Sequence, residues 1–168
     1  VTDGVFTAFG PGLAQQYEAQ GGDLAAIEVV DLGGKLVCPP FCDTHLHLDY
    51  VFTARKPGAV NESGTLFEGI QRWSETKSDL TVDEIKQRAK IGIKKEMLHG
   101  VQLIRSHADV TDPNLTSLKA LLELKEELKD TVTLQIVSFP QEGMYSYEGP
   151  HGESGAELVE EGLKMGAD

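Results

Sequence analysis

The sequence predicts an α/β protein built on a parallel sheet. From residue 36 onward, short apolar segments typical of strands alternate with longer amphipathic segments typical of helices. Such alternation indicates a parallel sheet, in which a crossover helix joins each strand to the next. The strands are nearly all apolar, which fits burial on both faces. The pattern alone leaves two architectures open, a doubly wound sheet and a (β/α)8 barrel.

Three strands and four helices are expected in this region. Thr81 and Glu84 match a capping box that starts one helix, and Gly100 is placed to end it. Asp112 and Pro113 match an N-cap followed by a proline at the first helical position. The predicted strands span residues 36–48, 101–106 and 132–139, and the predicted helices span residues 65–77, 81–98, 113–129 and 154–165.

Residues 1–37 have a different character from the rest of the chain. Two short segments, residues 5–9 and 29–32, are strand-like, and glycine-rich turns follow them. We expect short β elements here. The remaining residues provide only about three strand–helix units, whereas a complete (β/α)8 barrel needs about 250 residues. We therefore expect this chain to be the N-terminal part of a larger enzyme.

The composition narrows the range of partners. The chain holds 15 Lys and Arg against 27 Asp and Glu, a net charge of −12. Nucleic acid and anionic membranes both favour basic patches, so neither is expected as a partner. No apolar run is long enough to span a bilayer, and a cytoplasmic location is expected. Cys38 and Cys42 are interpreted as small buried apolar residues kept reduced.

The most informative residues are His45 and His47. Both follow an apolar strand, and residues two apart on a strand point to the same side, with Cα atoms about 6.5 Å apart. Two imidazoles so placed can converge on one metal ion. Two ligands leave a site incomplete, because a catalytic zinc usually has three protein ligands. Asp43 shares this face on regular alternation; it either braces the metal site or accepts hydrogen bonds from backbone donors.

Other polar residues follow the next two strands. His107 and Asp109 end the second strand, and Gln141 and Glu142 follow the third. The carboxyl ends of parallel strands are where barrels and open α/β sheets place their sites. His107 is expected to face the pocket or to support a metal ligand rather than to be one. Glu142 is expected to hold its loop in place.

The stretch from Pro40 to His47 resembles the metal-dependent amidohydrolase superfamily, in which a His-x-His pair ends the first barrel strand. A closer resemblance to the cytosine deaminase branch of that family runs over most of residues 36–168. The segments that carry it are residues 63–70 (Ser-Gly-Thr-Leu-Phe-Glu-Gly-Ile), 105–110 (Arg-Ser-His-Ala-Asp-Val) and 139–143 (Phe-Pro-Gln-Glu-Gly).

The resemblance implies a fold, a cofactor and an activity. Residues 1–37 would form part of a small β-sandwich domain, and residues 38–168 the first strand–helix units of a (β/α)8 barrel. His45 and His47 would bind one divalent metal ion, Fe²⁺ or Zn²⁺. Gln141 would read the amide edge of a pyrimidine base, with Leu66 and Phe139 lining its pocket. The remaining metal ligands and the catalytic Glu, His and Asp of the family would lie beyond residue 168.

The expected reaction is hydrolytic deamination of cytosine to uracil and ammonia by a metal-activated water. A related amidohydrolase acting on another amino-substituted ring, such as isocytosine, an aminotriazine or a creatinine-like ring, stays open. So does a non-catalytic fragment that keeps the fold, since 168 residues alone are expected to be inactive. The family resemblance also leaves a homo-oligomer open.

Overall fold

The computed structural model describes residues 1–168 as two compact units, Val1–Cys38 and Pro39–Asp168. The first unit contains a short helix, α1 (Leu13–Ala19), and a 3₁₀ turn, η1 (Leu24–Ala26). The strands predicted at residues 5–9 and 29–32 are wrong for this structure. A strand needs hydrogen-bonding partners, and here the backbone pairs only at an isolated bridge between Thr2 and Val5, with no buried residue to support a sheet. The assignment of residues 1–37 to a small β-sandwich domain stays a prediction.

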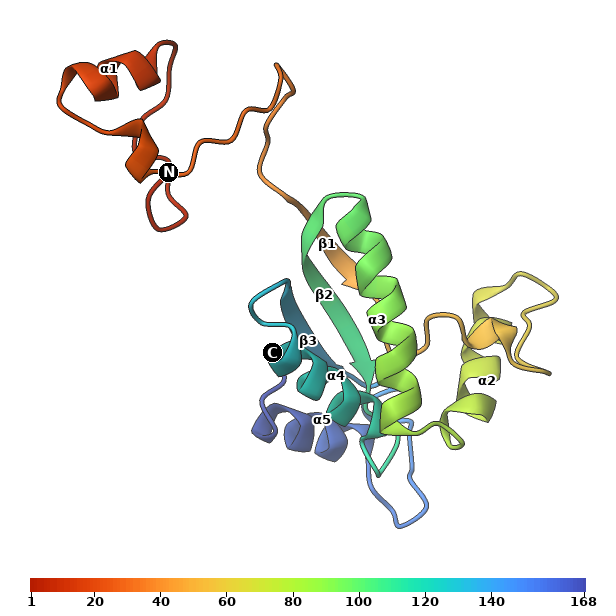
Figure 1. Ribbon diagram of the computed structural model, residues 1–168. Helices are drawn as coiled ribbons and strands as arrows, with labels where there is room; N and C mark the ends of the chain where they lie inside the picture. The colour runs from red at the N-terminus through yellow and green to blue at the C-terminus, as the bar shows by residue number, and fades with distance from the viewer. The chain divides into compact units, whose positions relative to one another are not determined.

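The second unit is an α/β structure with three parallel strands in the order β1–β2–β3 (Figure 1). Its strands are β1 (Phe41–Leu46), β2 (Val101–Asp109) and β3 (Thr133–Phe139). Its helices are α2 (Leu66–Lys77), α3 (Val82–Leu98), α4 (Thr116–Glu127) and α5 (Gly155–Lys164), with a 3₁₀ turn, η2 (Thr53–Arg55), after β1. Consecutive strand order is what a barrel requires.

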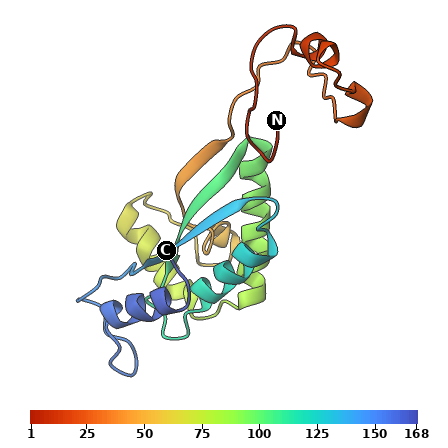
Figure 2. The same ribbon diagram turned by 90° about the vertical axis from the view of Figure 1, so that its left-hand side faces the viewer.

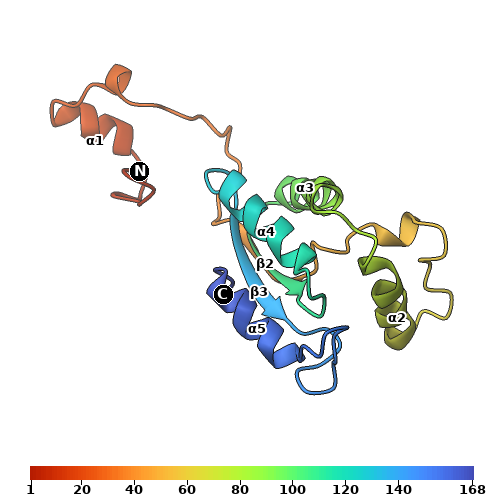
Figure 3. The same cartoon turned by 90° about the horizontal axis from the view of Figure 1, so that it is seen from below.

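The core lies between one face of the sheet and helices α3 and α4, which cover the same side (Figure 3). Alternate residues of β2 and β3 point into it, because strand side chains alternate between faces. Its fully buried apolar members from the strands and from α3 and α4 are Ile85, Ala89, Ile104, Ala108, Leu118, Ala120, Leu121, Leu124 and Ile136. Burial on both faces was expected, but the opposite face is only half covered in these residues, and Leu103 there is 39% exposed.

Capping explains most of the helix boundaries. Thr81 Oγ1 accepts from the Glu84 N–H at 3.2 Å, but the Glu84 carboxylate pairs with Lys56 at 2.7 Å instead of completing the predicted capping box. Ser154 and Glu157 form a complete capping box at the start of α5. Gly100 adopts a positive φ of 87° and turns the chain from α3 into β2.

The start of α4 differs from the prediction. The helix begins at Thr116, not at Pro113, and Leu115 is its N-cap residue with a φ of 51°. Asp112 still caps the helix, because its carboxylate accepts from the Thr116 N–H at 3.0 Å across an intervening turn. Leu115 is 4% exposed, so apolar burial offsets the cost of its left-handed backbone.

Two further features bear on the earlier expectations. Cys38 and Cys42 are free thiols, as expected, but both are exposed, because they lie at and before the edge strand β1. None of the helices combines the length and the apolar character that crossing a bilayer would require.

A glycine on α5 tests how this helix packs on β3, which the turned view shows alongside it (Figure 2). In Gly162→Ala, the new Cβ would lie 2.4 Å from Ser138 Oγ and 3.0 Å from Leu118 Cδ2. We expect the variant to lose about 1–3 kcal/mol of stability through overpacking, despite the better helix propensity of alanine. Thermal and urea unfolding of the complete polypeptide measure the loss.

Adding Ser138→Ala to Gly162→Ala removes the closest contact and should restore part of the lost stability. Glu161→Ala, at the exposed neighbouring position, serves as a control and should change stability by less than about 0.5 kcal/mol. A Gly162→Ala protein at least as stable as the wild type would contradict this packing.

Candidate active site

The carboxyl ends of β1, β2 and β3 meet at one edge of the sheet because the strands are parallel. A cavity of about 570 Å³ lies at this edge. All five residues predicted to bind metal or substrate line it, although they come from three separate parts of the chain. Its full lining is His45, His47, Tyr50, Asn61, Gly64, Thr65, Leu66, Gly69, Ile70, Trp73, Phe139 and Gln141.

The two predicted metal ligands lie side by side. The ring centroids of His45 and His47 are 5.3 Å apart, and their planes are inclined by 66°. Tyr50 stacks on His47 at 4.6 Å, and Phe139 lies edge-on to it at 5.6 Å. These aromatic contacts hold the His47 imidazole in place. His45, on β1, is more exposed than His47.

The protonation of His47 suits a metal ligand. Its Nδ1 lies 3.1 Å from the backbone carbonyl oxygen of His107, so Nδ1 carries the hydrogen and Nε2 keeps its lone pair. Burial lowers the pKa of His47 to about 4, which keeps the ring neutral near pH 7. The donor set therefore fits a divalent metal. No group of three or more His, Cys, Asp or Glu side chains is arranged here to hold one.

Asp43 does not share the face of the histidines as regular alternation predicts. In the sheet register, Asp43 lies beside Ile104, whose side chain points into the core, and Leu46 lies beside Ser106. Three residue steps on β1 thus match two on β2, which is a β-bulge that interrupts the alternation. The Asp43 carboxylate accepts from the His45 N–H at 2.9 Å. Of the two expected roles, bracing the metal site or accepting from backbone donors, the structure shows the second.

His107 supports the pair rather than lining the cavity. Its ring stacks on His45 with centroids 4.2 Å apart, and its carbonyl orients His47. Its own Nδ1 is buried without a hydrogen-bond partner. Burial and the neighbouring His45 and Arg105 lower the pKa of His107.

One side of the cavity is a face of α2, of which the family resemblance indicated only Leu66. Leu66, Ile70 and Trp73, spaced at helical intervals on α2, line the cavity, and we call them the α2 wall. Trp73 is the buried residue of α2. It is 4% exposed and packs on Tyr50 with centroids 4.7 Å apart, and its Nε1–H also donates to Asp109 at 2.7 Å.

Two buried carboxylates, those of Asp49 and Asp109, lie next to the cavity residues Tyr50 and Trp73. The Asp49 carboxylate accepts from the backbone N–H of Asp109 at 2.8 Å and from its neighbour Tyr50 at 3.1 Å. Burial raises the pKa of Asp49 to about 7 despite these donors. Asp49 follows His47 by two residues in the sequence, and that spacing was the available signal for its place near the site.

The loop before α2 is held by its own polar groups. The Glu68 carboxylate accepts from the backbone N–H groups of Glu62 at 3.1 Å and Ser63 at 2.6 Å. Hydrogen bonds from the Ser63 side chain and from these two backbone groups lower the pKa of Glu68 to about 2. Within the loop, Asn61 Nδ2 donates to the Thr65 carbonyl and Asn61 Oδ1 accepts from the Gly64 N–H. The loop therefore presents a preformed rim to the cavity.

Glu142 holds its loop, as expected from the sequence. It accepts from Ser74 Oγ at 2.8 Å and from Lys77 Nζ at 2.5 Å, both on α2. The preceding residue, Gln141, lines the cavity and donates its backbone N–H to the Phe139 carbonyl at 3.1 Å. The loop that carries Gln141 is thus attached to α2.

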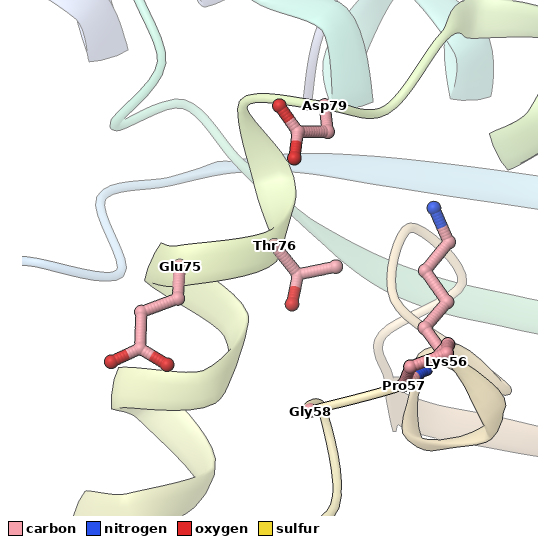
Figure 4. A pocket seen from close by; sticks show the side chains of 6 residues that line it. All are labelled: Lys56, Pro57, Gly58, Glu75, Thr76 and Asp79. Carbon is pink, nitrogen blue, oxygen red and sulfur yellow. The ribbon is translucent and has the colours of Figure 1, made fainter.

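A second cavity, of about 420 Å³, lies between the turn Lys56–Gly58 and the end of α2 (Figure 4). Three of its polar side chains, those of Lys56, Glu75 and Thr76, already have partners. Lys56 pairs with Glu84 at 2.7 Å, and Thr76 Oγ1 donates to the Arg72 carbonyl at 2.7 Å. It contains no histidine, cysteine or aromatic residue, so the cavity at the strand ends is the candidate active site.

Comparison with known proteins agrees with this geometry. Residues 28–162 match the model of the amidohydrolase family, and the chain belongs to that family. It is 34% identical over 143 residues to the N-isopropylammelide isopropyl amidohydrolase of Pseudomonas sp. strain ADP, covering 83% of this chain and 34% of that protein. It is 27% identical over 125 residues to the pterin deaminase of Rhizobium rhizogenes strain K84, covering 71% of this chain and 28% of that protein.

Solved structures of 5-methylcytosine deaminase from Klebsiella pneumoniae are also similar. The form liganded with 5-fluorocytosine shares 46% identity at a TM-score of 0.73, and the form liganded with phosphonocytosine shares 48% at 0.72. Each match covers 86% of this chain and 35% of the solved chain. The chain thus spans about a third of the length of the relatives it matches.

Glu68 provides a pH-dependent test of the loop. Because its pKa is lower in the folded protein than in the unfolded chain, its ionised form stabilises the fold above about pH 4.5, and this contribution is lost as the pH falls toward 2. Glu68→Gln should therefore lower the thermal midpoint at pH 7, and the difference from wild type should shrink below pH 4.5.

Thermal unfolding of the complete polypeptide from pH 7 down to pH 3 checks this expectation. Glu75→Gln is the matched control, since Glu75 lies on the same helix and pairs with Arg72 at 3.1 Å without holding the loop. The control should have the smaller effect at pH 7. A Glu68→Gln midpoint equal to that of the wild type at pH 7 would contradict the role of the carboxylate.

Proposed function

We propose that the complete polypeptide containing this chain hydrolytically deaminates cytosine to uracil and ammonia. The observation that carries the proposal is the convergence of His45, His47, Leu66, Phe139 and Gln141 on one cavity at the carboxyl ends of the strands. Membership of the amidohydrolase family supports a hydrolytic reaction. The similar solved structures, whose ligands are cytosine analogues, support an aminopyrimidine substrate.

His45 and His47 are proposed to hold one divalent metal ion, Fe²⁺ or Zn²⁺. Such an ion would, when bound, lower the pKa of a water so that hydroxide is available near pH 7 to attack the ring carbon that bears the amino group. The Nδ1–H of His47, bound to the His107 carbonyl, directs Nε2 away from β2. Because the two imidazoles leave the coordination incomplete, further ligands are proposed to come from outside these 168 residues, within a (β/α)8 barrel of which β1–β2–β3 is the opening part.

The remaining cavity residues are proposed to bind the ring. A carboxamide offers a donor and an acceptor, so Gln141 can pair with the amide edge of a pyrimidine. Phe139 lies beside the histidine pair, and Leu66 lies across the cavity on α2, so both can pack against an apolar ring. A ring held between them would bring its amino-bearing carbon toward the histidines.

A related amidohydrolase activity on another amino-substituted heterocycle is the second candidate. It is favoured by the relatives, whose names refer to an ammelide and a pterin, and by a cavity of about 570 Å³. A panel of cytosine, 5-methylcytosine, isocytosine, an aminotriazine, creatinine and a pterin, assayed for product and ammonia, separates the two. Turnover of another ring but not of cytosine would favour the second candidate. No turnover of any ring by the metal-loaded polypeptide would favour a non-catalytic protein.

The metal role predicts the effect of removing one histidine. His45→Ala in the complete polypeptide should abolish ammonia release from cytosine and lower the bound metal per chain, because the substitution removes a ligand. Elemental analysis and an ammonia assay, after loading with Fe²⁺ or Zn²⁺, measure both quantities. His151→Ala, which changes an exposed histidine in a loop, should leave both unchanged. Normal metal content and turnover in His45→Ala would exclude the metal role.

The recognition role predicts a binding defect. Gln141→Leu keeps much of the side-chain volume but removes the donor and the acceptor. We expect kcat/KM for cytosine to fall roughly 10- to 100-fold, which corresponds to the loss of one or two neutral hydrogen bonds. Steady-state kinetics measure the change. Gln71→Leu, at an exposed position on α2, is the matched control and should retain wild-type kinetics. Unchanged kcat/KM in Gln141→Leu would contradict its role.

A further inference from the structure

A lysine at the end of α2 joins three separate parts of the site. The Lys77 Nζ donates to Asp109 Oδ2 at 3.1 Å, to Thr111 Oγ1 at 3.0 Å and to Glu142 Oε1 at 2.5 Å. Asp109 ends β2, Thr111 follows it, and Glu142 follows β3. The Lys77 side chain is only 11% exposed, so solvent screens these interactions much less than it screens a surface ion pair. We call these four residues the Lys77 cluster.

Helix α2 depends on polar contacts of this kind. It lies apart from the α3–α4 layer (Figure 3), and Trp73 is its only buried residue. At the start of the helix, Leu66 and Phe67 are 74% and 83% exposed, so little apolar packing holds that end. Besides the packing of Trp73 on Tyr50, the Lys77 cluster and the hydrogen bonds from Trp73 and Ser74 attach α2 to the strand ends.

The Lys77 cluster connects the two sides of the candidate active site. Lys77 is on the same helix as the α2 wall, and its partner Glu142 is the residue next to Gln141. We propose that Lys77 is a positioning residue that sets the width of the cavity, holding the α2 wall and the Gln141 carboxamide at the separation that the substrate ring requires. This inference rests on the proposed function, because it assigns Lys77 to the binding of the same ring.

Loss of the ammonium should loosen this arrangement without unfolding it. Asp109 would keep its hydrogen bonds from Trp73 and from the backbone N–H and hydroxyl of Thr111. Glu142 would keep its bond from Ser74. No buried carboxylate is therefore left without a hydrogen-bond donor. Asp109, which is 1% exposed, does lose its counter-ion, so we expect Lys77→Met to be less stable than the wild type.

The test compares Lys77→Met with a matched lysine elsewhere. Lys86 on α3 is 14% exposed and also pairs with two carboxylates, Glu123 and Glu127, but it lies on the α3–α4 side, away from the cavity. In the complete metal-loaded polypeptide, Lys77→Met should raise KM for cytosine roughly tenfold and leave kcat within about threefold, as expected for weakened binding of the ground state and transition state alike. Lys86→Met should lower the thermal midpoint at unchanged KM.

Two further variants keep the proposal testable. Lys77→Arg retains the charge and should recover most of the wild-type KM. If Lys77→Met does not yield folded protein, Glu142→Gln replaces it, since Glu142 is 30% exposed and its amide keeps the size but not the charge; its KM should rise in the same direction. A KM equal to that of the wild type in whichever variant is measured would overturn the proposal.

Hydrogen exchange of the same proteins separates this proposal from the proposed function. In Lys77→Met, or in Glu142→Gln where that variant replaces it, the amides of α2 and of residues 141–143 should exchange faster together, and in Lys86→Met they should not. If the wild-type polypeptide turns over none of the heterocycles, the proposed function fails and the exchange measurement alone decides whether Lys77 couples the two segments. Exchange unchanged in both segments would then overturn the coupling.

Discussion

Parallel pairing of three consecutive strands is the constraint on which the candidate site depends. The continuous register from Leu103 beside Thr133 to Asp109 beside Phe139 brings the ends of β2 and β3 to the same level. β1 pairs with the other side of β2 in the same direction, which brings His47 to that edge as well. Residues separated by about 90 positions therefore share a cavity without any long loop having to fold back. Helices α3 and α4, which cover one face of the sheet, support this edge but contribute no residue to the cavity.

Hydrogen bonds and ion pairs attach the α2 side of the site, in addition to the packing of Trp73 on Tyr50. The α3–α4 layer has an ordinary aliphatic core, whereas α2 is attached through Trp73, Ser74 and Lys77 to carboxylates at the strand ends. The loop before α2 is likewise held by the Glu68 carboxylate. Directional contacts restrict position more narrowly than apolar ones, and binding sites depend on such restriction. In this region, charge specifies geometry more than it adds stability.

Much of this arrangement follows from local sequence patterns. The strand after residue 100, the strand after residue 132 and the four helices are set by hydrophobic periodicity and capping, and the structure confirms each of them within a few residues. The exceptions have physical causes. Residues 5–9 and 29–32 have strand-like composition but no partner strand, and composition alone cannot supply hydrogen bonds. The turn after Asp112 lengthens the route into α4 because buried Leu115 accepts an unusual backbone conformation.

The site could be predicted only in part. His45, His47 and Gln141 stand at strand ends, where position in the sequence indicates position in space, and they do line one cavity. Whether they bind metal and substrate stays a prediction. Of the α2 wall, only Leu66 was foreseen. Ile70, Trp73 and Lys77 were not, because a helix inserted between β1 and α3 can dock in many ways, and an ion pair joining residues 77 and 142 leaves no local pattern. The bulge in β1 was equally invisible, and it removed Asp43 from the histidine face.

The bond between His47 and β2 has an evolutionary consequence. The acceptor that orients the imidazole is the carbonyl of residue 107, which belongs to the main chain and is present whatever side chain that position carries. A change of side chain at position 107 therefore leaves the hydrogen bond that orients His47 in place. A histidine oriented by an Asp or Glu side chain would lose its acceptor on such a change. A lineage could exchange the residue at 107, and with it the ring that stacks on His45, and still inherit the same tautomer at 47. The bond that orients His47 therefore places no requirement on the side chain at position 107, whereas an acidic partner would have to be kept.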